Sequence, residues 1–447
     1  MPNLRATPYE TEATPPGLPY IIVSEAAERF SYAGMKTILI IFMTQHLVAQ
    51  SGEPALMGNG EAKGWYHLFA SAAYFFPLLG GVLADAFLGK YRTIYWLSIV
   101  YCLGHLALAI DSTRVGLAVG LALIAIGSGG IKPCVSAHLG DQFGARNTHR
   151  LERMYTWFYF AINVGSALSM LATPWLLVHY GPHVGFGVPG LLMLVATMMF
   201  RAGRDVFVHV PPGGMATLRQ TFSRAGLASI STLLTLYAFM SVFFSLFSQT
   251  GSAWVVQAQQ MDRTIFGVEL LPAQVQAAEP IFLLALLPLS TYVVYPALAR
   301  WFEPTPERRI GLGMGLMALV FVLLAWIEVR IVAGEAPSIG WHILGYLVLT
   351  LAEVLVTVTC VELSYTRAPR HMKSLIMAML AFSVSLGNIF TSAINFFVVG
   401  DDGHGPLAGP AYFLFFAAMM ALALLVYLPF AHWLGRRPTI GGTHARS

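Results

Sequence analysis

The first apolar stretch of the chain carries an unusual set of ionisable side chains. They are Glu25, Glu28, Arg29, Tyr32 and Lys36. On an α-helix, offsets of 3, 4, 7 and 11 residues place side chains on one face about 100° wide. A face of acids, bases and a tyrosine on an apolar helix is expected to line a polar cavity. The alternative is a buried ion-pair network that only holds helices together.

The spacing of the acids favours proton chemistry. Glu25 and Glu28 are close in sequence, so their charges repel and one carboxylate should hold its proton more tightly. Arg29 stays charged, because a guanidinium is not deprotonated in proteins. A protonatable carboxylate beside a fixed cation suits a proton-coupled step. Protonation of Glu25 or Glu28 would loosen its pairing with a basic partner, for which Lys132 is the candidate.

Ionisable side chains also interrupt other apolar stretches. Lys132, Glu279 and Glu353 are the clearest cases. A charged group inside a membrane helix costs roughly 2.5–3.5 kcal/mol on insertion scales. Such residues are therefore candidates for function.

Composition indicates that these residues belong to a membrane protein. Hydrophobic residues make up 56% of the 447 residues and charged residues 11%, against roughly 25% charged in ordinary globular chains. A soluble protein of this size cannot bury so much apolar surface. Disordered, coiled-coil, collagen-like and disulfide-rich classes are excluded as well. Three scattered cysteines suit neither a disulfide framework nor a zinc site, and we expect no metal, no cofactor and no nucleic-acid partner.

Twelve apolar stretches are long enough to cross ~30 Å of hydrocarbon as helices. They lie near 20–49, 64–87, 92–110, 115–138, 151–179, 184–208, 227–256, 271–299, 309–332, 339–365, 373–399 and 409–434. The predicted fold is an all-α membrane protein of two six-helix bundles. Its parts are a mobile cytoplasmic tail 1–19, an N-terminal bundle 20–208, a cytoplasmic linker 209–226, a C-terminal bundle 227–434 and a tail 435–447.

The distribution of positive charge orients these helices. With a cytoplasmic N-terminus, nineteen of the 26 lysines and arginines fall in inner segments, and only Lys63, Arg114, Arg263 and Arg330 fall in outer ones. The positive-inside rule then places both termini in the cytoplasm. Six plus six helices with a polar cytoplasmic linker is the layout of a transporter whose halves rock about a central site.

Four sequence motifs carry resemblances to known families. The turn Gly80–Lys90, in which Asp85 can cap a helix or pair with a nearby basic residue, resembles the loop signature of the major facilitator superfamily. Glu25–Tyr32 resembles the E-x-x-E-R-F signature of the proton-dependent oligopeptide transporter (POT) family. Gly129–Phe143 and Phe158–Ser166 are similar to its signatures in spans four and five. The resemblance runs from residue 25 to about residue 390.

The resemblance implies import of di- and tripeptides together with protons. Glu353 matches the glutamate that binds the peptide's ammonium group, whereas Arg29, Lys36 and Lys132 would supply the positive pole for its carboxylate. Because these charges lie on opposite bundles, one zwitterion would bridge both halves and favour an occluded state. Tyr32 and Asn163 match family positions that contact the peptide backbone, and Tyr74 resembles a residue in the second span of the animal members. We expect Trp254 to form part of the apolar walls of the side-chain pockets.

His67 is a candidate for proton coupling. Tyr66-His67 resembles the second span of the animal members, whose matching histidine has that role. An unperturbed histidine titrates near pH 6.5 and can change charge across an external pH gradient. The alternative is an interfacial histidine that is hydrogen-bonded to a neighbour.

Several positions depart from the family pattern. Lys36 replaces an arginine and loses its bidentate fork, and Ser248 stands where the family has an acid. Glu279-Pro280 replaces Asn-Pro, so Glu279 either takes over an acidic role near the site, or binds the ammonium group, or caps a helix. Leu380 replaces a tryptophan, which would make the pocket roomier.

Two alternatives to peptide transport are open. A family member could carry another solute, such as nitrate or a drug-like compound, although Glu353 together with the basic cluster favours a zwitterion. A membrane enzyme would need a nucleophile–base pair or a metal set, and no HExxH or GxSxG motif occurs. We expect a monomeric carrier in the inner (plasma) membrane that is not an enzyme.

Overall fold

The computed structural model of the protein describes residues 5–214, 224–300, 303–367, 373–399 and 405–435. Much of the predicted linker and nearly all of the predicted C-terminal tail therefore lie outside the described residues. The chain divides into two compact units. The first comprises Met1–Met57 and Phe69–Thr221, and the second comprises Gly58–Leu68 and Phe222–Ser447. The segment Gly58–Leu68 thus groups with the second unit, although the predicted N-terminal bundle contained it.

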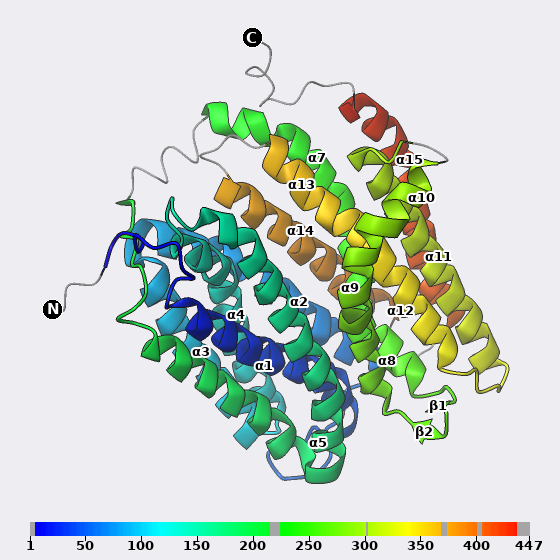
Figure 1. Ribbon diagram of the computed structural model, residues 1–447. Helices are drawn as coiled ribbons and strands as arrows, with labels where there is room; N and C mark the ends of the chain where they lie inside the picture. Colours follow the sequence, from blue (N-terminus) through cyan, green and yellow to red (C-terminus); the bar gives the residue numbers. More distant parts are fainter. Residues whose placement is uncertain (1–4, 215–223, 301–302, 368–372, 400–404, 436–447) are drawn as a thin grey trace. The chain divides into compact units, whose positions relative to one another are not determined.

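The first unit is built from long apolar helices, in which α1 packs on α5 and α3 packs on both α4 and α5 (Figure 1). Its elements are α1 (Leu18–Gln45), the part of α2 (Asn59–Val82) that follows Leu68, η1 (Leu83–Leu88), α3 (Lys90–Ile110), α4 (Arg114–Asp141), η2 (Thr148–Arg150) and α5 (Leu151–Ala202). Helices α2 and α4 approach closely, because a Cβ atom on Gly80 would overlap the backbone of Gly130.

Helix α5 combines two predicted spans. Gly181 has φ +79° and ψ −178° inside it, a conformation that is essentially confined to glycine. The kink at Gly181 therefore replaces the loop that we expected between 179 and 184. The helix ends at Ala202 rather than at residue 208, and Phe207 and Val208 beyond it are fully buried.

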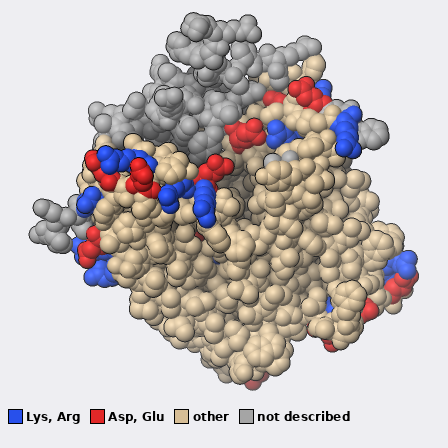
Figure 2. Space-filling model, viewed as in Figure 1, with Lys and Arg blue, Asp and Glu red and all other residues tan. Residues whose placement is uncertain are grey.

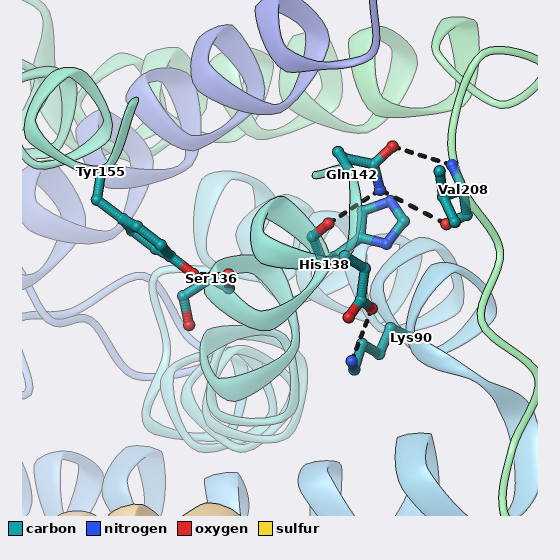
Figure 3. Close-up of polar contacts among 7 residues, drawn as sticks. Lys90, Ser136, His138, Gln142, Tyr155 and Val208 are labelled. Carbon is teal, nitrogen blue, oxygen red and sulfur yellow. Dashed lines mark hydrogen bonds and ion pairs between the residues drawn. The ribbon is translucent and has the colours of Figure 1, made fainter. Parts of the chain in front are cut away.

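The segment that follows α5 is held against the end of α4 (Figure 3). Gln142 accepts a hydrogen bond from the backbone N–H of Val208 at 2.9 Å and donates one to the carbonyl of His138 at 2.9 Å. Lys90, the last residue of the Gly80–Lys90 turn, forms an ion pair with Asp141 at 2.7 Å, and Asp85 lies within electrostatic range of the same lysine. The backbone carbonyl of Asp85 accepts a hydrogen bond from the N–H of Gly213 at 2.8 Å.

The described part of the N-terminal tail also has fixed partners. The Arg5 carbonyl accepts a hydrogen bond from the N–H of His209 at 2.8 Å, and the Asn147 side chain donates one to the Ala13 carbonyl at 3.2 Å. We expected a mobile tail. These contacts attach the segment to the first unit.

The second unit pairs α14 with α7, and it packs α11 against both α12 and α15. Its elements are the start of α2, α7 (Arg224–Phe247), η3 (Ser248–Gly251), α8 (Ala253–Ala258), β1 (Thr264–Ile265), β2 (Val268–Glu269), η4 (Pro272–Ala277), α9 (Ala278–Leu289), η5 (Ser290–Val294), α10 (Tyr295–Ala299), α11 (Pro306–Val332), α12 (Gly340–Glu353), η6 (Val354–Val358), α13 (Thr359–Arg367), α14 (Lys373–Ile394), η8 (Asn395–Val399) and α15 (Pro410–Gly435). Several predicted spans are therefore interrupted by short 3₁₀ or π segments.

A small hairpin, which we did not predict, joins α8 to η4. Strands β1 and β2 are antiparallel, with Thr264 opposite Glu269. The two turn residues, Phe266 and Gly267, have φ +48° and +80°, as a two-residue hairpin turn of type I′ requires. The Phe266 side chain is fully exposed at the tip.

The helices have the length and composition of membrane spans. Ten helical segments of the described residues are long and apolar enough to cross a bilayer, and one of them, Thr148–Ala202, has 55 residues. Helix α1 is not among the ten, and it carries Glu25, Glu28, Arg29 and Lys36. On the face drawn in Figure 2, charged side chains are scarce over the middle of the helices. The protein therefore has the all-α membrane fold that we predicted, while the count of twelve crossings stays a prediction.

Candidate functional site

The charged face of α1 forms a compact ion-pair cluster. Arg29 Nε lies 3.1 Å from Glu25 Oε1, one helical turn away, and it also pairs with Glu28 Oε2. Both carboxylates are buried. The second oxygen of Glu28, Oε1, has no hydrogen-bond partner in the described part of the chain. Arg29 therefore holds two buried acids at once, and one of them retains an oxygen that can accept a proton.

Lys132 of α4 lies beside this cluster. Its ammonium group is 4.0 Å from the ring centroid of Tyr32 and 4.6 Å from that of Tyr74. It also lies within electrostatic range of the α1 acids, of Arg29 and of Lys36. Lys132 Nζ is buried and has no hydrogen-bond acceptor within the described residues. The contact with two aromatic faces is a cation–π arrangement, and it leaves the three donors of the ammonium group available.

Asn163 is the remaining predicted site residue of the first unit. It is buried on α5 and donates a hydrogen bond to the Tyr159 carbonyl at 2.9 Å. Its amide oxygen can still accept. This hydrogen bond stays within α5, so the structure does not assign Asn163 to the Arg29 cluster.

The predicted residues of the second unit lie along α12 (Gly340–Glu353). Glu353 is the last residue of α12, directly before the π segment η6, and such segments are frequent at functional sites. Its Oε2 atom is buried without a hydrogen-bond partner among the residues described. Glu279, in the first turn of α9, lies within electrostatic range of Glu353 and of Tyr346. Trp254 is fully buried, with its ring centroid 4.6 Å from that of Tyr346.

His67 is buried in a polar network of the second unit. Its Nδ1 lies 2.8 Å from Asn388 Oδ1 and its Nε2 lies 2.8 Å from Ser252 Oγ. The Asn388 amide donates to Ser248 Oγ at 2.9 Å, so its oxygen faces the histidine and must accept from Nδ1–H. Nε2 then accepts from the Ser252 hydroxyl in the neutral ring. In the charged ring the direction reverses, because a hydroxyl can both donate and accept.

Sequence reasoning missed the partners of His67. Ser252 lies four residues after Ser248, the position that we compared with an acid of the family, but Asn388 gave no signal. Ser31 was missed as well: its hydroxyl lies 2.7 Å from Nε2 of His105, and both side chains are buried. This contact joins α1 to α3 next to Glu28. For Asn388 and for Ser31, the only clue in the sequence is a single polar residue in an apolar stretch.

Comparison with known proteins identifies the family. A family model described as "POT family" matches residues 91–233 and 225–403. The chain is 35% identical over 363 residues to peptide transporter family 1 of Drosophila melanogaster, covering 71% of this chain and 48% of that protein. It is 32% identical over 398 residues to solute carrier family 15 member 2 of Homo sapiens, covering 78% of this chain and 53% of that protein. The chain spans about half the length of these curated relatives.

Solved structures agree on the fold. The crystal structure of the POT family transporter PepTSo has a TM-score of 0.85 and 33% sequence identity, and the match covers 95% of this chain and 99% of that one. A peptide transporter POT, solved in complex with sulfate, has a TM-score of 0.81 at 21% identity over 96% of this chain and 97% of that one. The latter likeness concerns the fold alone. With a family model that matches most of its length, this chain belongs to the proton dependent oligopeptide (POT) family of transporters.

Proposed function

We propose that this protein is a proton-coupled symporter, not an enzyme, that imports di- and tripeptides across the inner membrane by alternating access. It would act as a monomer that crosses the membrane twelve times, with both termini in the cytoplasm. Membership of the POT family and relatives named as peptide transporters support this proposal. The residues that would carry it lie partly in each unit.

The observation that carries the proposal is the incomplete hydrogen bonding of Glu353. A buried carboxylate oxygen without a donor is expensive, and Oε2 of Glu353 is such an oxygen among the described residues. The ammonium group of a peptide brings three donors and a positive charge. Glu279, within electrostatic range, increases the negative potential at the same place. A peptide N-terminus would satisfy this group, with Trp254 and Tyr346 as apolar neighbours.

The first unit offers the complementary charge. Lys132 has an ammonium group whose donors are available, and Lys36 lies within its electrostatic range. A peptide carboxylate would bind there, while Tyr32, Tyr74 and Asn163 would contact its backbone. The proposal requires one peptide to engage cations of the first unit and acids of the second.

Proton coupling would use the Arg29 cluster and His67. A proton on Glu28 or Glu25 would cancel one of the two charges that Arg29 balances, and the released positive charge would attract the peptide carboxylate. His67 would accept a second proton through the Ser252 hydroxyl. Protonation and substrate binding would thus act on the same ionic contacts.

A carrier of another solute, such as nitrate or a drug-like compound, is the alternative. A pure anion site has no use for an acid with an unsatisfied oxygen, and Glu353 therefore favours the zwitterion. The two readings differ in their response to loss of that acid: nitrate transport would tolerate Glu353→Gln, whereas peptide transport would not.

The test is uptake of labelled dialanine into liposomes that contain the purified protein. An imposed gradient, acidic outside, should drive accumulation, and a proton carrier should abolish it. Glu353→Gln should reduce uptake by about tenfold or more, since charged hydrogen bonds contribute about 1.5–3 kcal/mol.

The matched control is Glu335→Gln. Glu335 is a half-exposed glutamate paired with Arg330 at the end of α11, and its loss should leave uptake unchanged. Dialanine uptake that does not depend on the pH gradient, or full uptake by Glu353→Gln, would contradict the proposed function.

A further inference from the structure

The second unit contains a polar cavity that the proposed peptide site does not use. Its volume is about 320 Å³, and both Lys63 and Glu328 line it. The other polar side chains that line it are those of Asn59, Gln257, Gln260 and Tyr412. Ligand pockets in proteins run from roughly 300 to 1,000 Å³, so this cavity suits a solute smaller than a drug. Neither Glu353 nor Glu279 lines it.

Lys63 is the first reason to assign a ligand to the cavity. Its side chain is only 8% exposed, and its ammonium group lies 4.3 Å from the ring centroid of Tyr412. Among the described residues its ammonium group makes this cation–π contact and an electrostatic interaction with Glu328. A cation–π contact offsets part of the free-energy cost of burial, but it uses none of the three N–H donors of the ammonium group. A carboxylate is the natural partner for such a group.

Tyr412 is held in place to receive Lys63. Its hydroxyl accepts a hydrogen bond from the Asn395 amide at 3.2 Å, which anchors the ring from its far end. The ring face is therefore fixed beneath the ammonium group, and Lys63 is positioned rather than free to turn away.

Glu328 supplies the opposite charge. It lies within electrostatic range of Lys63 but forms no direct ion pair with it among the described residues. Instead one carboxylate oxygen accepts a hydrogen bond from Gln257 Nε2 at 2.6 Å. The second oxygen remains available, and an ammonium group is the donor that matches it.

A chain of hydrogen bonds fixes the orientation of Gln257. Its Nε2 also donates to the Leu324 carbonyl at 3.1 Å, and its Oε1 accepts from His342 Nε2 at 2.8 Å. The His342 ring packs against Trp254, with ring centroids 5.3 Å apart. Gln257 therefore presents its donor to Glu328 and cannot rotate without losing three partners. Gln257 is thus a rigid support for the Glu328 carboxylate, which forms no direct ion pair with Lys63 among the described residues.

We propose that this cavity, lined by Lys63, Glu328 and Gln257 and bounded by Tyr412, binds a small zwitterion of the size of one free amino acid. Lys63 binds the carboxylate and Glu328 binds the ammonium group. A direct Lys63–Glu328 ion pair would close such a site, whereas each charge lacks a direct ionic partner among the described residues. The proposal goes beyond peptide transport, because the site is separate from Glu353 and takes a solute without a peptide bond.

The experiment is isothermal titration calorimetry on the purified full chain with three matched probes. L-Alanine carries both charges, L-lactate has a hydroxyl in place of the ammonium group, and L-alaninamide has an amide in place of the carboxylate. L-Alanine should bind, and the other two should bind about tenfold or more weakly, because each leaves one buried charge unpaired.

Two variants locate the site. Lys63→Met keeps the apolar stem and removes the charge, and Glu328→Gln keeps an acceptor for Gln257. Each should weaken L-alanine binding by about tenfold or more and leave dialanine uptake unchanged. Glu353→Gln should lower dialanine uptake and leave L-alanine binding unchanged. This contrast separates failure of this proposal from failure of the proposed function.

Three results would overturn the inference. The first is absence of L-alanine binding to the unaltered protein, the second is L-alanine binding that survives both variants, and the third is equal binding of L-lactate.

A further variant tests whether an acid of the chain itself is the partner of Lys63, because Asp401 and Asp402 lie outside the described residues. If Asp401→Asn/Asp402→Asn lowers thermal stability as much as Lys63→Met does, and L-alanine does not bind, Lys63 is structural and the site is refuted.

Discussion

Single carboxylates carry most of the chemistry proposed for this protein. Glu28 and Glu353 each keep one buried oxygen without a hydrogen bond within the described residues, and each lies beside a group that changes its electrostatic environment. Arg29 supplies a fixed positive charge to Glu28, whereas Glu279 adds negative charge near Glu353. The first arrangement suits reversible binding of a proton, and the second suits binding of an ammonium group.

Glu28→Gln should separate proton coupling from peptide binding. A glutamine cannot bind and release a proton, so uptake driven by a pH gradient should fall by about tenfold or more. Exchange of labelled for unlabelled dialanine across liposomes, which needs no net proton movement, should persist. Glu152→Gln, at the exposed start of α5, is the control. Full gradient-driven uptake by Glu28→Gln would exclude the role.

His67→Ala should change the pH dependence of uptake. The imidazole is the side chain whose ordinary pKa lies between pH 5 and 8, and its loss should flatten the rise of uptake toward acidic external pH. Because Asn388 Oδ1 and Ser252 each lose a partner, stability should fall by about 1–3 kcal/mol. A normal pH profile in the variant would leave His67 with a structural role only.

Sequence reasoning found the site residues that contact one another and lie close together along the chain. The helical period alone brings Glu25, Glu28 and Arg29 together, and the structure confirms their contact. The partners of His67 are 185 and 321 residues away along the chain, so no local pattern could reveal them. The same holds for the Gln257–Glu328 hydrogen bond, whose residues lie 71 positions apart.

At the scale of helices and strands, apolar length predicted where helices lie but not where they break. The backbone of α5 passes through Gly181 without a loop, and the span that begins near residue 227 changes to a 3₁₀ turn at Ser248–Gly251. Such breaks depend on packing against neighbours, for example on Tyr66, which occupies the space of a Cβ atom at Gly251. The hairpin 264–269 was missed because Phe266 is an unusual residue for a turn with positive φ.

Gly181→Ala should destabilise the first unit. The position requires φ +79°, a conformation that costs a residue with a Cβ atom about 1–3 kcal/mol. Gly187→Ala, in the same helix, is a matched control, since a Cβ atom there meets nothing within 4 Å. Thermal unfolding in detergent should show a lower midpoint for Gly181→Ala only. Equal midpoints would mean that the kink does not depend on glycine.

For the molecule as a whole, the unequal distribution of positive charge between the connecting segments predicts the orientation of the helices in the bilayer. Lysines and arginines concentrate in the segments that we assign to the cytoplasm, as the positive-inside rule requires. The hairpin and the end of α11 fall on the opposite side in this topology. Composition therefore predicted the class of protein, and the order of the spans predicted the two-bundle plan, whereas the division of α2 between the two units could not be foreseen.

Cysteine labelling tests this topology. In a Cys102→Ser background, Phe266→Cys at the exposed hairpin tip should react with a membrane-impermeant maleimide on intact cells. Glu152→Cys, next to Arg150 and Arg153, should react only after the membrane is permeabilised. Labelling of Glu152→Cys in intact cells would reverse the assigned orientation.

The pH inside liposomes reports whether the protein moves a proton together with each peptide. Liposomes that contain the purified protein and a trapped pH dye start without a gradient, and dialanine is added outside. We predict that the lumen acidifies with the unaltered protein and with Glu335→Gln, but not with Glu353→Gln. Uptake of labelled dialanine by the unaltered protein without acidification would contradict proton symport.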